Sequence, residues 1–397
     1  MYRKLLLSLN FASIKLFFFR YLSYIFIGLE IVLLPMLVSN MDYGKIEYLK
    51  SLILLFPYAL LGSFSGYIYC LYNLEKDYYP QLFTGALVTG LLIGLVVFLI
   101  NPFLFLASIV NMFSVIIEKK LQTSNLFLLS ILFKPLLSVV FLLVFYLKIS
   151  FNHGLLISFC YLIALLIWLY LIKIFSYVIV IPRIVKLDKY FFYQYLTLIK
   201  KGFVINISTI IVSLFIFQNR FFINKFALDN LPSFSLAQNF SQIIFIGINT
   251  IGYISLVKFG ENLKLISKKD VLKVFFKTIY AFIALELVAY LAINMYINIV
   301  GGFQKSLQYF IITSLCVGIY YSVSVIAPIL LYKDKLNIST LVLGIFFILD
   351  YVSSWLLFDL IKINAFLIFI KSNLLLVICG LFNLHLIFNR ISYNNYE

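Results

Sequence analysis

Long apolar runs separated by short polar or basic connections dominate the chain. A transmembrane helix needs about 20 mostly apolar residues, and runs of that length recur from one end of the sequence to the other. This pattern predicts an all-α polytopic membrane protein with about 12 transmembrane helices. The predicted spans lie roughly at residues 17–39, 51–71, 82–100, 102–118, 126–148, 154–175, 203–223, 234–257, 274–299, 306–331, 338–358 and 364–388.

A basic and aromatic stretch divides these spans into two groups. It reads IPRIVKLDKYFFYQYLTLIKKG at residues 181–202, a composition typical of an interfacial helix lying against an anionic leaflet. We therefore predict an N-terminal six-helix lobe at residues 1–180, a cytoplasmic interfacial linker at residues 181–202 and a C-terminal six-helix lobe at residues 203–397. An even number of spans in each half gives both halves the same orientation, as in a parallel repeat.

Composition and charge support membrane insertion. The 397 residues are 64% hydrophobic and 12% charged, with a mean hydropathy of +1.08. That leaves too little polar surface to cover a soluble core. The net charge of +16 follows from the positive-inside rule, so nucleic-acid binding is not expected. With the N-terminus inside, roughly 20 lysines and arginines fall in inside connections and about 6 in outside connections, which predicts that both termini are cytoplasmic.

The sequence lacks the short motifs that mark common enzyme classes. It has no G-x-x-x-x-G-K-[ST] phosphate loop and no G-x-S-x-G nucleophile motif. His153 and His385 are the only histidines and fall in different predicted regions, while the four cysteines lie within apolar stretches. We therefore predict no enzyme activity, no catalytic residues, no metal site and no cofactor.

Charged residues inside the predicted spans are the clearest candidates for function, because each costs about 2.5–3.5 kcal/mol at a helix centre. Lys134 lies about eight residues, or roughly 12 Å, into its span and precedes Pro135. It suits a polar cavity or, alternatively, a structural ion pair, whereas Lys277 lies near a helix end and is expected to reach the interface. Arg20 and Arg220 lie nearer the ends of their spans, so each suits either a substrate-binding role or a side chain that reaches the membrane interface. The cations predicted to bind substrate are Lys134, Arg20, Arg220 and Lys371.

Three acidic residues, Glu30, Glu286 and Asp350, lie near the middle of their predicted spans. Carboxylates at this depth either pair with cations or take up a proton, so we predict ion-coupling roles for all three. Glu30 follows Arg20 by ten residues, which places the two about 80° apart around a helix and roughly 15 Å apart along it. They cannot pair directly, but they can line one cavity. Interior cations and acids joined by short connections indicate a transporter with a polar cavity.

Two stretches of the sequence are similar to one family of membrane proteins. The first is LLPMLVSNMDYGKIEYLKSLILLFPYALLGSFSGYIY, in which an acidic-Tyr-Gly group leads into the second span. The second is FQNRFFINKFALDNLPSFSLAQNFSQIIFIG, where Asn219 and Arg220 stand in place of the family's frequent Asp-Arg pair. Together with the two halves of spans, these stretches resemble the bacterial O-antigen and capsule repeat-unit flippases often called Wzx. That family belongs to the multidrug/oligosaccharidyl-lipid/polysaccharide exporter (MOP) superfamily.

The resemblance implies two six-helix lobes around a central cavity that opens alternately to each side of the bacterial inner membrane. It implies that an oligosaccharide repeat unit linked to undecaprenyl pyrophosphate moves from the cytoplasmic to the outer leaflet, driven by an ion gradient. In this interpretation Lys134 and the other interior cations neutralise the pyrophosphate. Membrane lipids and other polysaccharide-assembly membrane proteins are the implied partners.

Three alternatives remain open. A drug or cation exporter of the same superfamily would favour an anionic cavity, whereas cations outnumber acids within the predicted spans by five to three. A polysaccharide polymerase would carry a large outside loop with catalytic arginines, but the predicted outside connections are all shorter than about a dozen residues. A membrane glycosyltransferase would use Asp42 or Glu47 in the first outside connection as catalytic residues, but the sequence predicts no further domain to support such an active site.

Overall fold

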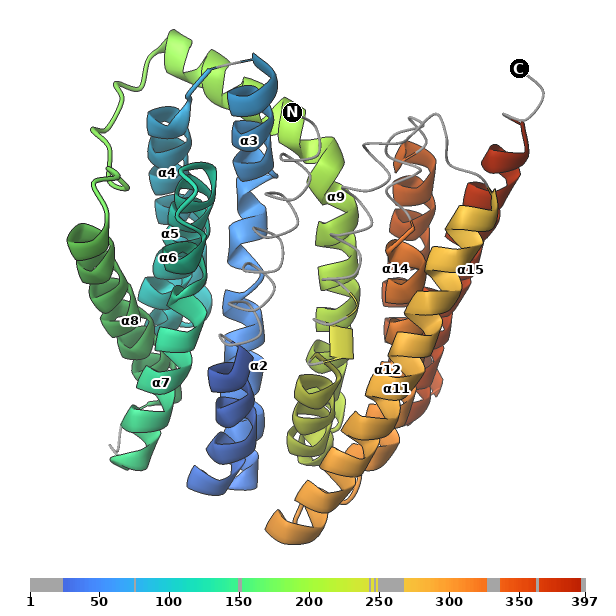
Figure 1. The fold of residues 1–397 in the computed structure, drawn as a ribbon. Helices are drawn as coiled ribbons and strands as arrows, with labels where there is room; N and C mark the ends of the chain where they lie inside the picture. Colours follow the sequence, from blue (N-terminus) through green and yellow to red (C-terminus); the bar gives the residue numbers. More distant parts are fainter. Residues whose placement is uncertain are drawn as a thin grey trace. The chain divides into compact units, whose positions relative to one another are not determined.

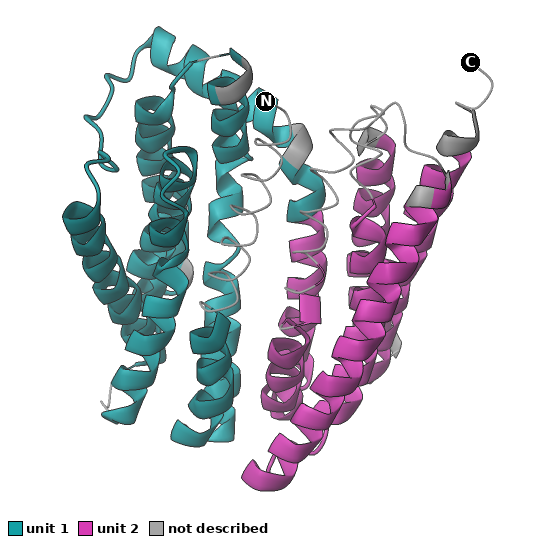
Figure 2. Cartoon of the chain, in the orientation of Figure 1, with its two compact units in different colours: residues 1–210 teal, residues 211–397 magenta. Residues whose placement is uncertain are grey.

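The computed structural model describes residues 24–74, 76–148, 152–242, 244–245, 248, 268–326, 336–361 and 364–393. Every regular element in these residues is a helix, so the predicted all-α class is confirmed (Figure 1). Two compact units divide the chain, residues 1–210 and residues 211–397 (Figure 2). By this division the predicted linker at residues 181–202 belongs to unit 1, and the boundary falls inside a single helix.

The helices follow one another with short connections. Unit 1 contains a helix at Tyr24–Leu37, followed by α2 (Asn40–Ile53), η1 (Phe56–Leu60), α3 (Ser63–Leu74), α4 (Tyr79–Ile100), η2 (Pro102–Leu104), α5 (Phe105–Thr123), α6 (Phe127–Ile131), α7 (Phe133–Tyr146) and α8 (His153–Phe175). Helix α9 (Lys189–Phe226) begins in unit 1 and ends in unit 2. Unit 2 continues with η3 (Leu228–Asn230), a helical stretch at 231–242, α11 (Lys268–Val300), α12 (Ser306–Ser324), α14 (Leu336–Ile361) and α15 (Ala365–Tyr393).

Eight of the described helices are long and apolar enough to cross a membrane, and one bent pair raises the number to nine. The bent pair joins Asn40–Leu60 to Ser63–Leu71 at 49°. The eight helices are Tyr79–Leu99, Pro102–Thr123, His153–Phe175, Asn206–Phe226, Val271–Val300, Ser306–Ser324, Ile338–Phe358 and Ala365–Asn389. The chain is therefore a multi-pass membrane protein. Parts of the predicted spans 17–39, 234–257 and 306–331 lie outside the described residues.

The prediction that residues 40–50 form a connection between two spans is wrong, because these residues fold as most of α2. The hydroxyl of Ser39 caps this helix by accepting a hydrogen bond from the backbone N–H of Asp42 at 3.2 Å. A hydropathy scan misses α2 because its charged residues lower the average of any window that contains them. The bend between this helix and α3 comes later in the chain, where Pro57 lies in the first turn of η1 and Gly62 adopts a φ of 80°.

The predicted span at 126–148 is also interrupted. Helix α6 ends at Ile131 and α7 begins at Phe133, so Leu132 separates two short helices. Pro135 lies in the first turn of α7, where its missing N–H removes no intrahelical hydrogen bond. The break lies at Leu132, three residues before this proline.

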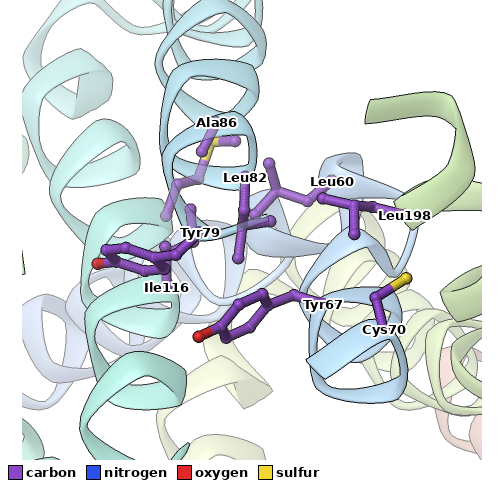
Figure 3. Packing of buried hydrophobic residues seen from close by; sticks show 9 residues of the cluster. Leu60, Tyr67, Cys70, Tyr79, Leu82, Ala86, Ile116 and Leu198 are labelled. Carbon is purple, nitrogen blue, oxygen red and sulfur yellow. The ribbon is translucent and has the colours of Figure 1, made fainter. Parts of the chain in front are cut away.

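The core of unit 1 joins α3, α4, α5 and the first half of α9. The rings of Tyr67 and Tyr79 lie at its centre, with their centroids 5.7 Å apart. Figure 3 shows the cluster that surrounds them, formed by Leu60, Tyr67, Cys70, Tyr79, Leu82, Ala86, Met112, Ile116 and Leu198. Burying such side chains gives each of these helices one fixed face in the unit.

The chain between α8 and α9 is held against the start of α4. The hydroxyl of Tyr79 donates to the carbonyl oxygen of Val180 at 2.7 Å. The backbone N–H of Val185 donates to the hydroxyl oxygen of Thr84 at 3.0 Å. This stretch has no helix or strand to provide hydrogen bonds for its backbone groups. The two bonds therefore satisfy some of these groups and hold the stretch on the surface of unit 1.

Three glycines let α9 approach the corner between η1 and α3. A Cβ atom added at Gly202 would lie 1.8 Å from the carbonyl oxygen of Gly62, and one added at Gly66 would lie 1.8 Å from that of Leu198. Such distances are far below van der Waals contact, and the obstructing atoms belong to backbone that cannot rotate away. Only glycine permits this packing.

The close packing predicts that Gly202→Ala destabilises the protein by about 1–3 kcal/mol, a typical cost of overpacking. Thermal unfolding of the purified protein in detergent measures this change as a lower melting temperature. Gly28→Ala is the matched control, because no atom lies within 4 Å of a Cβ added there. Equal melting temperatures for Gly202→Ala and the unsubstituted protein would contradict the packing argument.

Candidate functional site

A buried charge cluster lies in unit 1. The Nζ atom of Lys50 lies 2.5 Å from an oxygen of Glu30 and 2.6 Å from an oxygen of Glu47. The hydroxyl of Ser138 donates to the second oxygen of Glu30 at 2.5 Å, and the ring of Phe141 lies 5.3 Å from Lys50 Nζ. Glu30 and Glu47 are only 6% and 4% exposed. These groups are therefore held together away from solvent.

Local folding explains why the three charges meet. Glu47 and Lys50 are three residues apart on α2 and therefore share one face of the helix. Helix α2 turns back at Ser39 beside the helix Tyr24–Leu37. Glu30 precedes the turn by about as many residues as Lys50 follows it, so the two reach a similar depth at ~1.5 Å per residue. The sequence assigned Lys50 to a connection and therefore missed it.

Two carboxylates of this cluster share the ammonium group of Lys50. Removing one member of a buried ion pair is costly, because the charge that remains is uncompensated in a low-dielectric interior. The burial of Glu30 and Glu47 therefore depends on Lys50.

A second buried cluster lies in unit 2 and centres on Asp350 of α14, whose side chain is fully buried. The Nζ atom of Lys371, on α15, lies 3.1 Å from one carboxylate oxygen. The side-chain amide of Gln218, on α9, donates to the other oxygen. Lys371 also donates to the hydroxyls of Ser353 and Ser354 at 2.7 and 2.8 Å. A charge-balanced pair and its hydrogen bonds thus connect three helices.

A small cavity in unit 2 is lined in part by Asn219 and Ser372, which follow Gln218 and Lys371 of this second cluster in the chain. Its volume is about 10 Å³, near the space that one water molecule needs. Its polar lining includes four oxygens that are buried and have no hydrogen-bond partner among the described residues, namely those of Asn219, Gln238, Thr313 and Ser372. Amide and hydroxyl oxygens are suited to a water molecule or a single desolvated cation.

Glu286, on α11, makes a separate polar contact in unit 2. The hydroxyl of Ser314, on α12, donates to one of its carboxylate oxygens. Glu286 is half-buried, so it joins α11 to α12 without belonging to the network around Asp350. Within the described residues, no three or more histidine, cysteine, aspartate or glutamate side chains form a group suited to a metal ion.

The predicted cations occupy different surroundings. Lys134 is exposed in the first turn of α7 and makes no ion pair with any described residue. Arg220 is buried at 3% exposure, next to Gln218 and Asn219 in the chain. Arg20 lies outside the described residues, so its relation to Glu30 stays a prediction. Lys371 is paired with Asp350, although the sequence assigned these two residues to different roles.

Three comparisons with known proteins bear on the fold. A scan against protein-family models found no match, and neither did a search of curated proteins. Among solved structures, the chain is similar to an inward-facing multidrug resistance MATE family transporter of the MOP superfamily. The identity is 10%, the TM-score is 0.65, and the match covers 94% of this chain and 99% of that one.

Two further solved structures show the same likeness. An outward-facing multidrug resistance MATE family transporter matches at 13% identity and a TM-score of 0.58, over 97% of this chain and 96% of that one. A MATE protein in complex with Br-NRF matches at 12% identity and a TM-score of 0.50, over 98% and 96% of the two chains. At these identities the likeness establishes the fold.

The unit 1 cluster predicts that Lys50→Met destabilises the protein by about 3–5 kcal/mol, because two buried carboxylates lose their shared cation. Thermal unfolding in detergent measures the loss. The triple variant Glu30→Gln, Glu47→Gln and Lys50→Met removes all three charges and should recover most of the lost stability. Lys45→Met, at an exposed position of the same helix, is the matched control and should change little. A triple variant less stable than Lys50→Met would contradict this account.

Proposed function

We propose that the chain is a transporter that works by alternating access. The likeness in fold to MATE transporters captured in inward-facing and outward-facing conformations carries this proposal. The buried clusters support it, because ionisable groups at membrane depth are costly and commonly mark a substrate or ion path. A purely structural membrane protein would gain more from apolar helix packing at these positions.

The proposed substrate is an oligosaccharide repeat unit linked to undecaprenyl pyrophosphate, moved from the cytoplasmic to the outer leaflet of the bacterial inner membrane. Its support is the resemblance of the stretches around Asp42 and Arg220 to repeat-unit flippases. In this proposal Lys371, Arg220, Lys134 and Arg20 contact the pyrophosphate. Lys50 joins them as a candidate, since it is a buried cation that the sequence did not single out.

The proposed coupling residues are Glu30, Glu286 and Asp350. Glu30 shares Lys50 with Glu47, so displacement of this lysine would leave Glu30 in need of another cation, such as a proton or a sodium ion. Asp350 is paired with Lys371, so its carboxylate would bind a proton or a sodium ion only when Lys371 moves away. Glu30 and Asp350 therefore support coupling when their lysine is displaced, whereas Glu286 contacts the hydroxyl of Ser314.

A drug or cation exporter is the second candidate. Two of the solved neighbours are named as multidrug resistance transporters. The described interior also differs from the sequence prediction: Glu47 joins the three predicted carboxylates, Lys50 joins the cations, and Lys134 and Lys277 are exposed. Among the described residues, four carboxylates (Glu30, Glu47, Glu286 and Asp350) thus stand beside three cations (Lys50, Arg220 and Lys371), so the predicted surplus of cations does not hold there.

The two candidates predict different accumulations in cells that lack the gene. Loss of a flippase should trap single lipid-linked repeat units on the cytoplasmic leaflet, measured by extracting polyprenyl-linked sugars and testing their accessibility to impermeant reagents. Expression of the chain should clear them, and expression of Lys50→Met should not. Single units accumulating on the outer leaflet would indicate a polymerase. Unchanged lipid-linked sugars with altered drug sensitivity would favour the exporter.

Coupling predicts that Glu286→Gln and Asp350→Asn each lower gradient-driven transport in proteoliposomes at least about tenfold, because an amide cannot take up a proton or balance a cation. The measurement is the initial rate with and without an imposed proton or sodium gradient. Asp229→Asn is the matched control, since Asp229 is exposed in η3. Unchanged gradient dependence in both variants would remove these residues from coupling.

A further inference from the structure

The stretch between α8 and the membrane part of α9 presents an unusual surface. We call it the interfacial segment and define it as residues 176–203. It lies between the candidate spans His153–Phe175 and Asn206–Phe226, and its first part has no helix or strand up to Lys186. Irregular backbone exposed to lipid is not tolerated in hydrocarbon, so this part lies at the level of the lipid head groups.

Large apolar side chains point away from the protein along the whole interfacial segment. Before α9, the outward residues alternate with inward ones: Tyr177 and Ile179 are 105% and 72% exposed, whereas Val180 is 8% exposed. On α9, Tyr193 and Leu196 are 73% and 60% exposed. Tyrosine and aliphatic side chains with this exposure suit the boundary between head groups and acyl chains.

Basic side chains share this outward surface. Four of them are exposed within the interfacial segment, namely Arg183, Lys186, Lys189 and Lys200. Lys201 is exposed too, but its Nζ atom lies 5.3 Å from the ring of Tyr69. Its acidic residue, Asp188, accepts a hydrogen bond from the backbone N–H of Phe191 at 2.8 Å and so caps the start of α9. The surface is therefore strongly cationic, and its charge is complementary to anionic head groups.

The opposite face of the interfacial segment packs against the rest of unit 1, and this packing sets the direction of the outward face. Phe191 and Leu198 are buried, and the side chain of Gln194 accepts a hydrogen bond from Gln81 at 2.9 Å. Gly202 packs against the backbone of Gly62. An amphipathic helix held this way cannot turn its aromatic and basic face toward the protein.

We propose that the interfacial segment is a binding surface for anionic phospholipid head groups of the inner leaflet, with its lysines and arginine on the phosphates and its tyrosines and aliphatic side chains among the upper acyl chains. This surface depends on membrane insertion and on the predicted cytoplasmic side of the segment, and not on the transport cycle. Each basic residue near an anionic surface contributes about fivefold in affinity.

The test compares lipid retention by the full chain. The protein is reconstituted in vesicles of phosphatidylcholine and phosphatidylglycerol, extracted in mild detergent, and its bound lipids are quantified. We expect phosphatidylglycerol to be enriched over its share of the vesicle. Lys186→Gln with Lys189→Gln should lower that enrichment at least about tenfold. Lys45→Gln with Lys148→Gln changes the same charge at exposed lysines elsewhere in unit 1 and should preserve it.

Two further arms separate charge from apolar contact. About 1 M salt, with a Debye length of ~3 Å, should abolish the enrichment. Tyr193→Ser with Leu196→Ser should lower retention of both lipids without changing their ratio. Enrichment that survives Lys186→Gln with Lys189→Gln, or that both lysine pairs reduce equally, would overturn the proposal. In the first case the cationic face would be assigned to a protein partner instead.

Discussion

A charge buried in a membrane helix needs a partner at the same depth, and this requirement governs how both units pack. Lys50 lies between Glu30 and Glu47, which fixes the helix Tyr24–Leu37 against α2. Asp350 joins Lys371 and Gln218, which ties α14 to α15 and α9. Sliding any of these helices by one turn, about 5.4 Å, would leave a charge without its partner in hydrocarbon.

The two units meet this requirement with different sets of partners. In unit 1, the carboxylates of Glu30 and Glu47 share one lysine, Lys50. Unit 2 pairs one carboxylate with one lysine; the amide of Gln218 donates to the carboxylate, and two serine hydroxyls accept hydrogen bonds from Lys371. Displacing Lys50 would therefore expose two carboxylates to the loss of one cation, whereas displacing Lys371 would expose one.

The sequence predicted the membrane helices, which depend on average polarity, and missed the buried ion pairs, which depend on contacts between helices. Apolar runs define the all-α membrane class because hydrocarbon admits only long, internally satisfied helices. The same averaging misread α2, since Glu47 and Lys50 look like a connection until their shared helical face is placed beside Glu30. Depth alone also favoured Lys134, but it is exposed in the first turn of α7, which follows a break at Leu132 that periodicity does not reveal.

On the proposed function, these pairs link substrate charge to proton movement with a definite sign. A lysine cannot neutralise a pyrophosphate and a carboxylate equally well at once, so an anionic head group that binds Lys50 or Lys371 leaves Glu30 or Asp350 short of positive charge. Anion binding then favours proton uptake, and by linkage proton uptake favours anion binding. An organic cation would act in the opposite way, because it would satisfy the same carboxylates and release their proton. The direction of proton movement on binding therefore follows from substrate charge.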